Sequence, residues 1–362
     1  MTTSTARLPL SKRLGKRLER YRERLRFAAS LRHIHGPRRR FAAPEEVTLV
    51  ALVRNGSYYL DAFFDYYQGL GIRHFVFFDN GSDDDTITQI RKRPGTAILQ
   101  SRLPWGAFEN AFRSYAARRY ATDRWCLIVD MDEIFDFQGR ADIGLTGLVQ
   151  YLSANGYTAF MAQMLEMFPK APLRDVAKMP YPEVLEAFSF YDLSAISAYP
   201  YHSADTGLSF FLNQNHPKDA NAPQVLFGGV RAKVFGEACC LTKHPLLFVG
   251  PAVQAGVHPH AASGVRVAPM TGLIKHYKFA DDALARDRKS VETASIAHGE
   301  DKLRLERLSK QPDLSLWSEA ARETPDIATL QDLGFLKASE DYDAYLREMS
   351  RKRTGPGKSV DG

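Results

Sequence analysis

The amino-acid sequence predicts an α/β fold built on a doubly wound, mostly parallel β-sheet. Short apolar runs begin near positions 47, 74, 96 and 125, and segments with helical periodicity separate them. This alternation has the spacing of βαβ units, which join parallel strands through helices. Residues 47–53 (VTLVALV) form a continuous apolar run, as expected of a parallel strand that is buried on both faces.

The elements of the first half follow in order along the chain. We expect strands at 47–53, 74–78, 96–99 and 125–129, and helices at 58–70, 84–93 and 107–121. Gly71 can end the first of these helices, and Pro94 with Gly95 can end the second. Residues 155–270 mix short apolar runs with many Pro, Gly, His and Tyr residues, which predicts mixed strands and long loops around a site.

The two ends of the chain differ from this central region. Apolar residues recur at three- and four-residue steps from Leu14 to Ala28, which indicates an amphipathic basic helix over about residues 11–31. A charged helical pattern starts again at Asp281. We therefore expect a basic helical arm at 1–44, a central domain at 45–280, a C-terminal helical extension at 281–350 and a disordered tail at 351–362.

The positive charge of the chain is concentrated in the arm. Residues 1–40 carry 13 of the 48 Lys and Arg residues but 2 of the 42 acidic residues, so the net charge of +6 describes the arm rather than the body. Residues 11–40 could lie on an anionic membrane surface, contact nucleic acid, or form a solvated helix against the body. We expect no nucleic-acid partner.

Nothing in the sequence resembles a membrane span or a secretory signal. The most apolar run after the first strand regions, 245–257, has 13 residues and is interrupted by Pro and Gly, which is too short to cross a bilayer. Three cysteines are too few for a disulfide framework. We expect a cytoplasmic protein that the arm could hold at the inner face of the membrane.

Polar clusters follow three of the predicted strands. Arg54 and Asn55 follow the first strand, residues 79–86 (DNGSDDDT) the second, and residues 130–133 (DMDE) the fourth. In an open parallel sheet, ligands bind beyond the carboxyl ends of the strands, so these clusters predict a binding site. Asp84, taken alone, is also a suitable helix N-cap.

The pair Asp130 and Asp132 predicts a metal site. Two carboxylates at positions i and i+2 after a strand can share one hard dication, and Mg²⁺ or Mn²⁺ prefers oxygen ligands and leaves places for substrate phosphates. The alternative is that both residues act as caps or surface ion pairs.

The ordered motifs VALVRN, FFDNGSDDDT and LIVDMDEIF resemble family 2-type glycosyltransferases with a GT-A fold. FGGVRAKVFG (227–236), LTKHPL (241–246) and LIKHYKF (273–279) are similar to a bacterial branch of that group, so the resemblance covers about residues 46–280. One departure is Gly56, where the relatives commonly carry an acid.

The resemblance implies an inverting transfer of sugar from a nucleotide-sugar donor to a hydroxyl of a glycan or lipid-linked acceptor. It assigns nucleotide contacts to Arg54, Asn55, Asp79, Asn80 and Asp84. It assigns Mn²⁺ or Mg²⁺ on the diphosphate to Asp130, Asp132 and His276, although His276 could instead be a core or surface histidine.

Other residues carry weaker expectations. Gly229 could let backbone N–H groups approach a phosphate, and Arg231 and Lys243 could neutralise phosphate charge; a structural turn and surface charge are the alternatives. For the general base, we consider Glu166 and Asp192, which stand among apolar residues where desolvation could raise a carboxyl pKa. Both could also be structural acids.

Two further functions stay open at this point. The chain could be a non-catalytic GT-A-like protein that binds a sugar nucleotide or a partner without turnover, or a nucleic-acid binder that acts through its arm. The donor sugar, the base and the acceptor cannot be read from the sequence.

Overall fold

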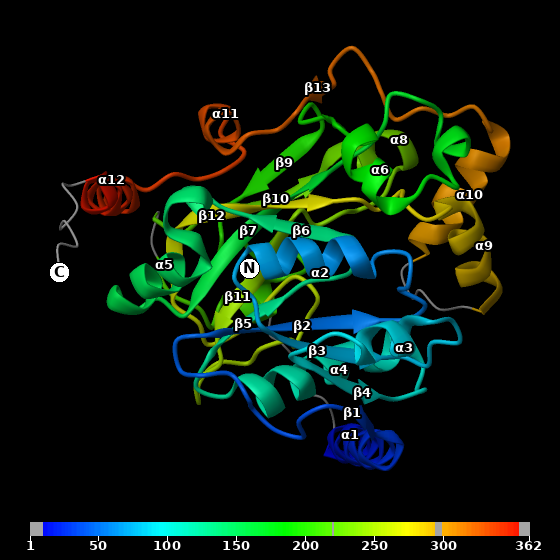
Figure 1. The fold of residues 1–362 in the computed structure, drawn as a ribbon. Helices are drawn as coiled ribbons and strands as arrows, with labels where there is room; N and C mark the ends of the chain where they lie inside the picture. Colours follow the sequence, from blue (N-terminus) through cyan, green and yellow to red (C-terminus); the bar gives the residue numbers. More distant parts are fainter. Residues whose placement is uncertain (1–9, 219–220, 294–298, 355–362) are drawn as a thin grey trace.

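The computed structural model describes residues 10–218, 221–293 and 299–354. Within these ranges, nine strands form one sheet in the order β1-β4-β3-β2-β5-β11-β7-β12-β6 (Figure 1). The strands are β1 Arg32–His35, β2 Val47–Val53, β3 His74–Asp79, β4 Thr96–Gln100, β5 Trp125–Ile128, β6 Glu133–Asp136, β7 Ala159–Glu166, β11 Thr242–Phe248 and β12 Val267–His276.

The predicted α/β class with a mostly parallel sheet is confirmed. Strands β4, β3, β2 and β5 are parallel neighbours, and β12 runs parallel to β7. Strand β11 is antiparallel to both β5 and β7, and β1 and β6 add antiparallel edges. In the register, Val53 pairs with Asp79 and Asp79 with Gln100, so the loops after these strands start at one edge of the sheet.

Helices cover both faces of this sheet (Figure 1). The described helices are α1 Leu10–Ser30, α2 Leu60–Gly69, α3 Thr86–Arg91, α4 Trp105–Ala121, α5 Arg140–Ala154, α6 Tyr181–Ala187, α7 Ser209–Leu212, α8 Gly229–Phe235, α9 Ala283–Thr293, α10 Glu300–Lys310, α11 Ile327–Asp332 and α12 Glu340–Thr354, with a 3₁₀ turn at Leu173–Val176. Short strands β8 Phe190–Tyr191, β9 Ile196–Tyr199, β10 Val225–Gly228 and β13 Arg322–Glu323 form two small ribbons.

Two hydrophobic clusters lie on the two sides of the sheet. One contains the buried side chains of α2 and α5, and the other contains those of α4. Helix α4 buries Phe108, Phe112, Ala116 and Tyr120, which recur every four residues and so share one face. The ring of Phe112 stacks on Phe78 of β3 with centroids 4.4 Å apart.

The arm is anchored to the body at its C-terminal end. The predicted N-terminal helix is confirmed over Leu10–Ser30, and Phe27 in its last turns contacts the rings of Phe78 and Phe112. The Ser30 hydroxyl also lies 2.8 Å from that of Ser101 after β4. Strand β1, which follows, was not predicted, because only its pairing with β4 distinguishes it from a loop.

The C-terminal region corrects one expectation. The tail was predicted to be disordered from residue 351, but α12 continues through Thr354, and residues 355–362 lie outside the described part. The C-terminal region also contributes to the core. One hydrophobic cluster contains buried side chains of the sheet together with Leu330, Phe335, Leu336 and Tyr342. The proposed boundary at residue 280 stays a prediction. No helix in the described ranges has the length and apolar character needed to span a bilayer.

The packing of α4 leads to a test of the fold. Phe112→Ala removes a fully buried ring and should lower the free energy of unfolding by about 3–5 kcal/mol. The same substitution at Phe210, whose side chain is 74% exposed, should cost less than about 0.5 kcal/mol. Urea denaturation of both variants measures the difference, and equal effects would contradict this packing.

Candidate active site

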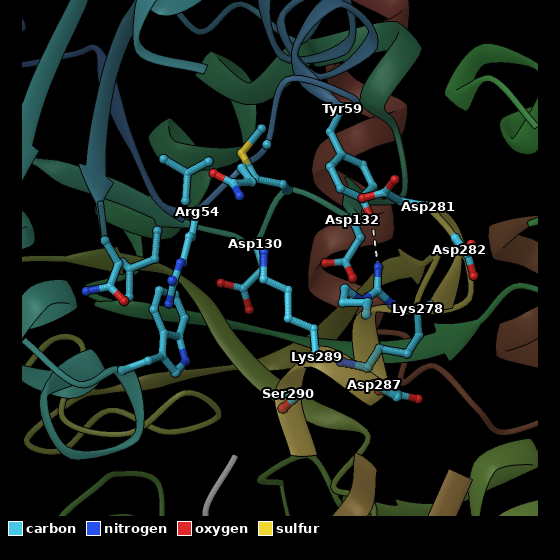
Figure 2. Close-up of a pocket in the computed structure, with 18 of the residues that line it drawn as sticks. Arg54, Tyr59, Asp130, Asp132, Lys278, Asp281, Asp282, Asp287, Lys289 and Ser290 are labelled. Carbon is cyan, nitrogen blue, oxygen red and sulfur yellow. Dashed lines mark hydrogen bonds between the residues drawn. The ribbon is translucent and has the colours of Figure 1, made fainter. Parts of the chain in front are cut away.

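Two adjoining cavities lie at the carboxyl ends of the parallel strands. The first has a volume of about 580 Å³ and the second about 330 Å³. Four residues line both cavities: Trp105, Asp130, Asp132 and Lys278. Figure 2 shows the first cavity, with Asp130 and Asp132 between Arg54 on one side and Lys278, Asp281 and Asp282 on the other.

Asp130 is held by two buried cations. Its carboxylate lies 3.2 Å from the Lys243 ammonium and 3.6 Å from the Arg113 guanidinium. Burial opposes ionisation of Asp130, but the charges of Lys243 and Arg113 outweigh it and lower the pKa. Lys243 also donates at 2.7 Å to both carboxylate oxygens of Glu133, which in turn accepts from the Asp130 backbone N–H. Asp130 is therefore an ionised and firmly positioned carboxylate.

Asp132 belongs to a chain of charges that reaches into the protein. Its carboxylate lies 3.5 Å from Nε2 of His276, and Nδ1 of His276 lies 2.8 Å from Oε1 of Glu166. Burial alone would lower the pKa of His276, but Glu166 and Asp132 outweigh it and raise the pKa to about 10. Because a carboxylate only accepts, the Glu166 contact fixes a proton on Nδ1 and leaves Nε2 to face Asp132.

Asp132 and His276 supply part of the ligand set that a hard dication needs. In the described residues, no group of three or more His, Cys, Asp or Glu side chains forms a complete metal site. Asp132 and His276 do offer an oxygen and a ring nitrogen at one place, and Glu166 orients the imidazole as second-layer carboxylates do for metal-bound histidines. These donors fit a cation that takes its other ligands from substrate phosphates and water.

The loop after β3 is built around Asp79. The carboxylate of this fully buried residue accepts from the backbone N–H groups of Gly81 and Ser82 and from Nε2 of Gln100, at 2.8–3.2 Å. All of these partners lie within the chain, and Asp79 lines neither cavity. Asp79 shapes this loop through these bonds, and its nucleotide contact stays a prediction.

Asn80 and Asn55 also hold the loops in place, but both line the first cavity. The amide of Asn80 donates to the carbonyls of Ser101 and Leu103 at 2.7 and 2.9 Å. Asn55, which has a positive φ of 54°, exchanges hydrogen bonds with Asp83 at 2.6 and 2.9 Å. The structure thus brings both residues to the predicted site.

Arg54 and Asp84 have different surroundings. Arg54 is exposed, lines the first cavity, and has no hydrogen bond or ion pair to any described residue. Asp84 lies outside both cavities and accepts from the backbone N–H groups of Ser57 and Thr86 at the start of α3. The carboxylate of Asp84 therefore caps a turn, and its nucleotide contact stays a prediction.

The surroundings of Gly56 explain why glycine stands at this position, where similar sequences commonly carry an acid. Gly56 is buried, its N–H donates to the Thr86 hydroxyl at 2.8 Å, and an added Cβ would lie 2.5 Å from a methyl carbon of Val53. A larger residue would force Val53 to move.

The two predicted general bases lie outside both cavities, and their expected rise in pKa is wrong. Burial raises the pKa of Glu166, but His276 and Arg231 outweigh it and lower the value to about 2. Asp192 likewise has a lowered pKa, because its bond with Lys233 at 2.7 Å outweighs its burial. Burial does raise the pKa of each acid, as expected. A cation lies beside each acid, however, and it lowers the pKa by more.

The glycine pair also has a structural role. Gly228 and Gly229 have φ values of 105° and 75°, and their N–H groups donate to the carbonyls of Cys239 and Ala195 at 2.9 and 2.8 Å. Gly229 lines neither cavity, and its phosphate contact stays a prediction. The expected cations Arg231 and Lys243 do line the second cavity.

Arg231 extends the chain of ion pairs from Glu166 to the C-terminal helices. It contacts Glu166 at 3.2 Å and Glu300 at 3.0 Å, and it also binds Glu237. Arg304 of α10 then joins Glu237 to Asp287 of α9. The C-terminal helices are therefore tied to the site through buried ion pairs.

Sequence reasoning missed several residues of the cavities, among them Trp105, Lys278 and Arg286. Lys278 stands two positions after His276 and could have been found from that spacing. Arg286 of α9 belongs to a segment that was interpreted only as a helical extension.

Comparison with known proteins adds no assignment. No protein-family model and no curated protein sequence matches this chain. The geometry of the site therefore carries the functional inference.

The buried histidine His244, which follows Lys243 on β11, gives a test of the native packing. Its Nδ1 lies 3.1 Å from the His260 carbonyl and its Nε2 lies 2.8 Å from the Tyr201 hydroxyl. Burial lowers its pKa to about 4, whereas an unfolded histidine titrates near pH 6.5. Between these values only the unfolded chain binds the proton, so native stability is complete above pH 6.5 and falls as the pH drops towards 4.

His244→Asn should reduce the slope of unfolding free energy against pH by about 1.4 kcal/mol per unit in this window. Urea denaturation at pH 4.5, 5.5 and 6.5 measures the slope. An unchanged slope would contradict a neutral buried imidazole.

Proposed function

We propose that the chain is a metal-dependent inverting glycosyltransferase with a GT-A fold, which uses a nucleoside-diphosphate sugar as donor. The observation that carries the proposal is the meeting of two cavities at Asp130 and Asp132. A transferase needs room for two substrates that touch at one point, and the metal-binding acids of the resembling family would lie at that point. The parallel strands β4-β3-β2-β5 followed by antiparallel β11 support the same fold.

The first cavity suits the nucleotide part of the donor. Its walls include Arg54, which is paired with no residue in the described part of the chain, the amides of Asn55 and Asn80, and the indole of Trp105. Amides can read the edge of a base or a ribose hydroxyl, and an indole offers a flat face for stacking. The volume of about 580 Å³ lies within the usual range of small-molecule sites.

Asp132 would hold Mn²⁺ or Mg²⁺ together with Nε2 of His276, which must lose its proton as the cation binds, and Asp130 lies on the same wall. When bound, such a dication supplies positive charge that stabilises a departing diphosphate. Glu166 keeps the His276 ring in orientation, and Lys243 with Arg113 keeps Asp130 ionised. In the reaction, the bond from the anomeric carbon to the phosphate oxygen breaks with its electron pair on that oxygen, while the acceptor oxygen bonds to the opposite face of the carbon.

The proton of the acceptor hydroxyl must pass to a base in the second cavity. Glu109 and Glu300 line this cavity, and their side chains are 21% and 31% exposed. Both are paired with arginine, Glu109 with Arg113 and Glu300 with Arg231. We propose that one of these two carboxylates takes the proton, in place of Glu166 and Asp192.

Asp132→Asn tests the metal role. The variant should lose at least about 100-fold in metal-dependent donor hydrolysis, because an amide replaces the charged ligand. The assay uses UDP-, GDP- and dTDP-sugars with and without Mn²⁺. Asp175→Asn, a surface change in the 3₁₀ turn, is the matched control. Unchanged hydrolysis by Asp132→Asn would contradict the metal role, and nucleotide binding without any turnover would favour the non-catalytic alternative.

Helix α1 supports a location at an anionic membrane, which we propose as the place of the reaction. Leu18, Tyr21 and Leu25 share one face of α1 and are 52%, 60% and 52% exposed. Exposed arginines flank this face: Arg17, Arg20, Arg22, Arg24 and Arg26. An apolar face bordered by cations suits the boundary between anionic headgroups and acyl chains.

The double change Leu18→Gln and Leu25→Gln should weaken binding to phosphatidylglycerol vesicles by at least about tenfold, since each lost leucine contributes about 1.5 kcal/mol or more when buried. Leu333→Gln, an exposed leucine of the C-terminal region, is the control. Vesicle co-sedimentation measures binding. Equal binding by the double variant, or equal binding to phosphatidylcholine, would contradict the membrane location.

A further inference from the structure

Lys278 stands where the two cavities meet. It follows β12 and lines both the first and the second cavity. Its side chain is half-buried and has no hydrogen bond or ion pair to any residue in the described ranges. Figure 2 shows it on the same wall as Asp287, below Asp132.

The other cations of the second cavity are already neutralised. Arg113 is paired with Glu109, Lys243 with Glu133, and Arg231 with three glutamates. No carboxylate of the described residues lies within ion-pair distance of Lys278. Lys278 is therefore the one cation of this cavity, among the described residues, whose charge has no direct partner.

A second cation, Arg286 of α9, holds the backbone beside Lys278. Its guanidinium donates to the Tyr59 hydroxyl at 3.1 Å, to the Ala280 carbonyl at 3.0 Å and to the carbonyl of Lys278 itself. These acceptors are all neutral, so Arg286 fixes the turn after β12 and leaves its own positive charge near the junction.

A half-buried ammonium without a counter-charge is unfavourable, because burial removes water and nothing replaces it. An anionic group of a ligand at the junction of the two cavities would compensate for the lost hydration of the ammonium. A fixed cation beside a leaving group also stabilises the negative charge that develops there, without reorganisation during the reaction.

We propose that Lys278 binds the diphosphate of the donor, and that Arg286 positions it and adds a second positive charge. This inference rests on the proposed function, since it places the donor's phosphates at the junction between the nucleotide cavity and the acceptor cavity. Lys278 transfers no proton. Its charge stabilises the phosphate oxygen that keeps the electron pair when the bond to the sugar breaks.

The test uses the full chain and inorganic pyrophosphate in EDTA, so that binding reports side chains rather than a metal. Calorimetric titration should show that Lys278→Gln weakens pyrophosphate binding by about tenfold or more, as expected for a lost charge-assisted bond. Lys278→Arg should retain most of the affinity because it keeps the charge. Lys275→Gln, on the preceding strand β12 but outside both cavities, should bind as the unchanged protein does.

The inference is overturned if pyrophosphate does not bind, if Lys278→Gln binds it as tightly as the unchanged protein, or if Lys278→Arg loses as much as Lys278→Gln. A weakened affinity for a carboxylated sugar but not for pyrophosphate would assign Lys278 to the acceptor and would also overturn the inference.

Thermal unfolding of each variant identifies a folding defect. If Lys278→Gln is unfolded, the affinity of Lys278→Arg decides the question. Absence of sugar transfer together with Lys278-dependent pyrophosphate binding would refute the transferase function and leave this anion site standing.

Discussion

The arrangement of the site depends on the contact between Glu166 and His276. This contact joins the ends of β7 and β12, holds a proton on Nδ1 of His276, and directs Nε2 towards Asp132. Glu166 is ionised in the interior because His276 and Arg231 both compensate its charge, and Arg231 is also paired with Glu237. Removal of one partner from such a buried set typically costs about 3–5 kcal/mol, because a charge is left without compensation. The pairing therefore constrains the site more tightly than any single hydrogen bond.

The same network explains how distant parts of the chain reach one cleft. The parallel strands deliver the loops after β2, β3 and β5 to one edge of the sheet. The C-terminal helices come from the far end of the chain, and the ion pairs of Arg304 with Glu237 and Asp287 hold α9 and α10 beside that edge. Through this anchoring, α9 brings Arg286 to the wall of the first cavity. The second half of the molecule thus completes a site that the first half begins.

Much of the first half could be predicted from the sequence, because apolar runs and helical periodicity are local signals. The strands near 47, 74, 96 and 125 and the grouping of Asp130 with Asp132 belong to this part. The roles of Asp79 and Glu166 could not be predicted in the same way. Asp79 points into its own loop because Gln100 and two backbone N–H groups surround it, and the pKa of Glu166 is lowered by cations from residues 231 and 276. Such partners are far apart in the sequence and meet only through tertiary packing.

Anomalous X-ray scattering from crystals grown with Mn²⁺ and a nucleoside diphosphate can locate the dication that we propose at Asp132 and His276. We expect one strong manganese peak within bonding distance of an Asp132 carboxylate oxygen and Nε2 of His276, with phosphate oxygens completing its coordination. A nucleotide bound in the first cavity with no manganese beside these two side chains would contradict this proposal.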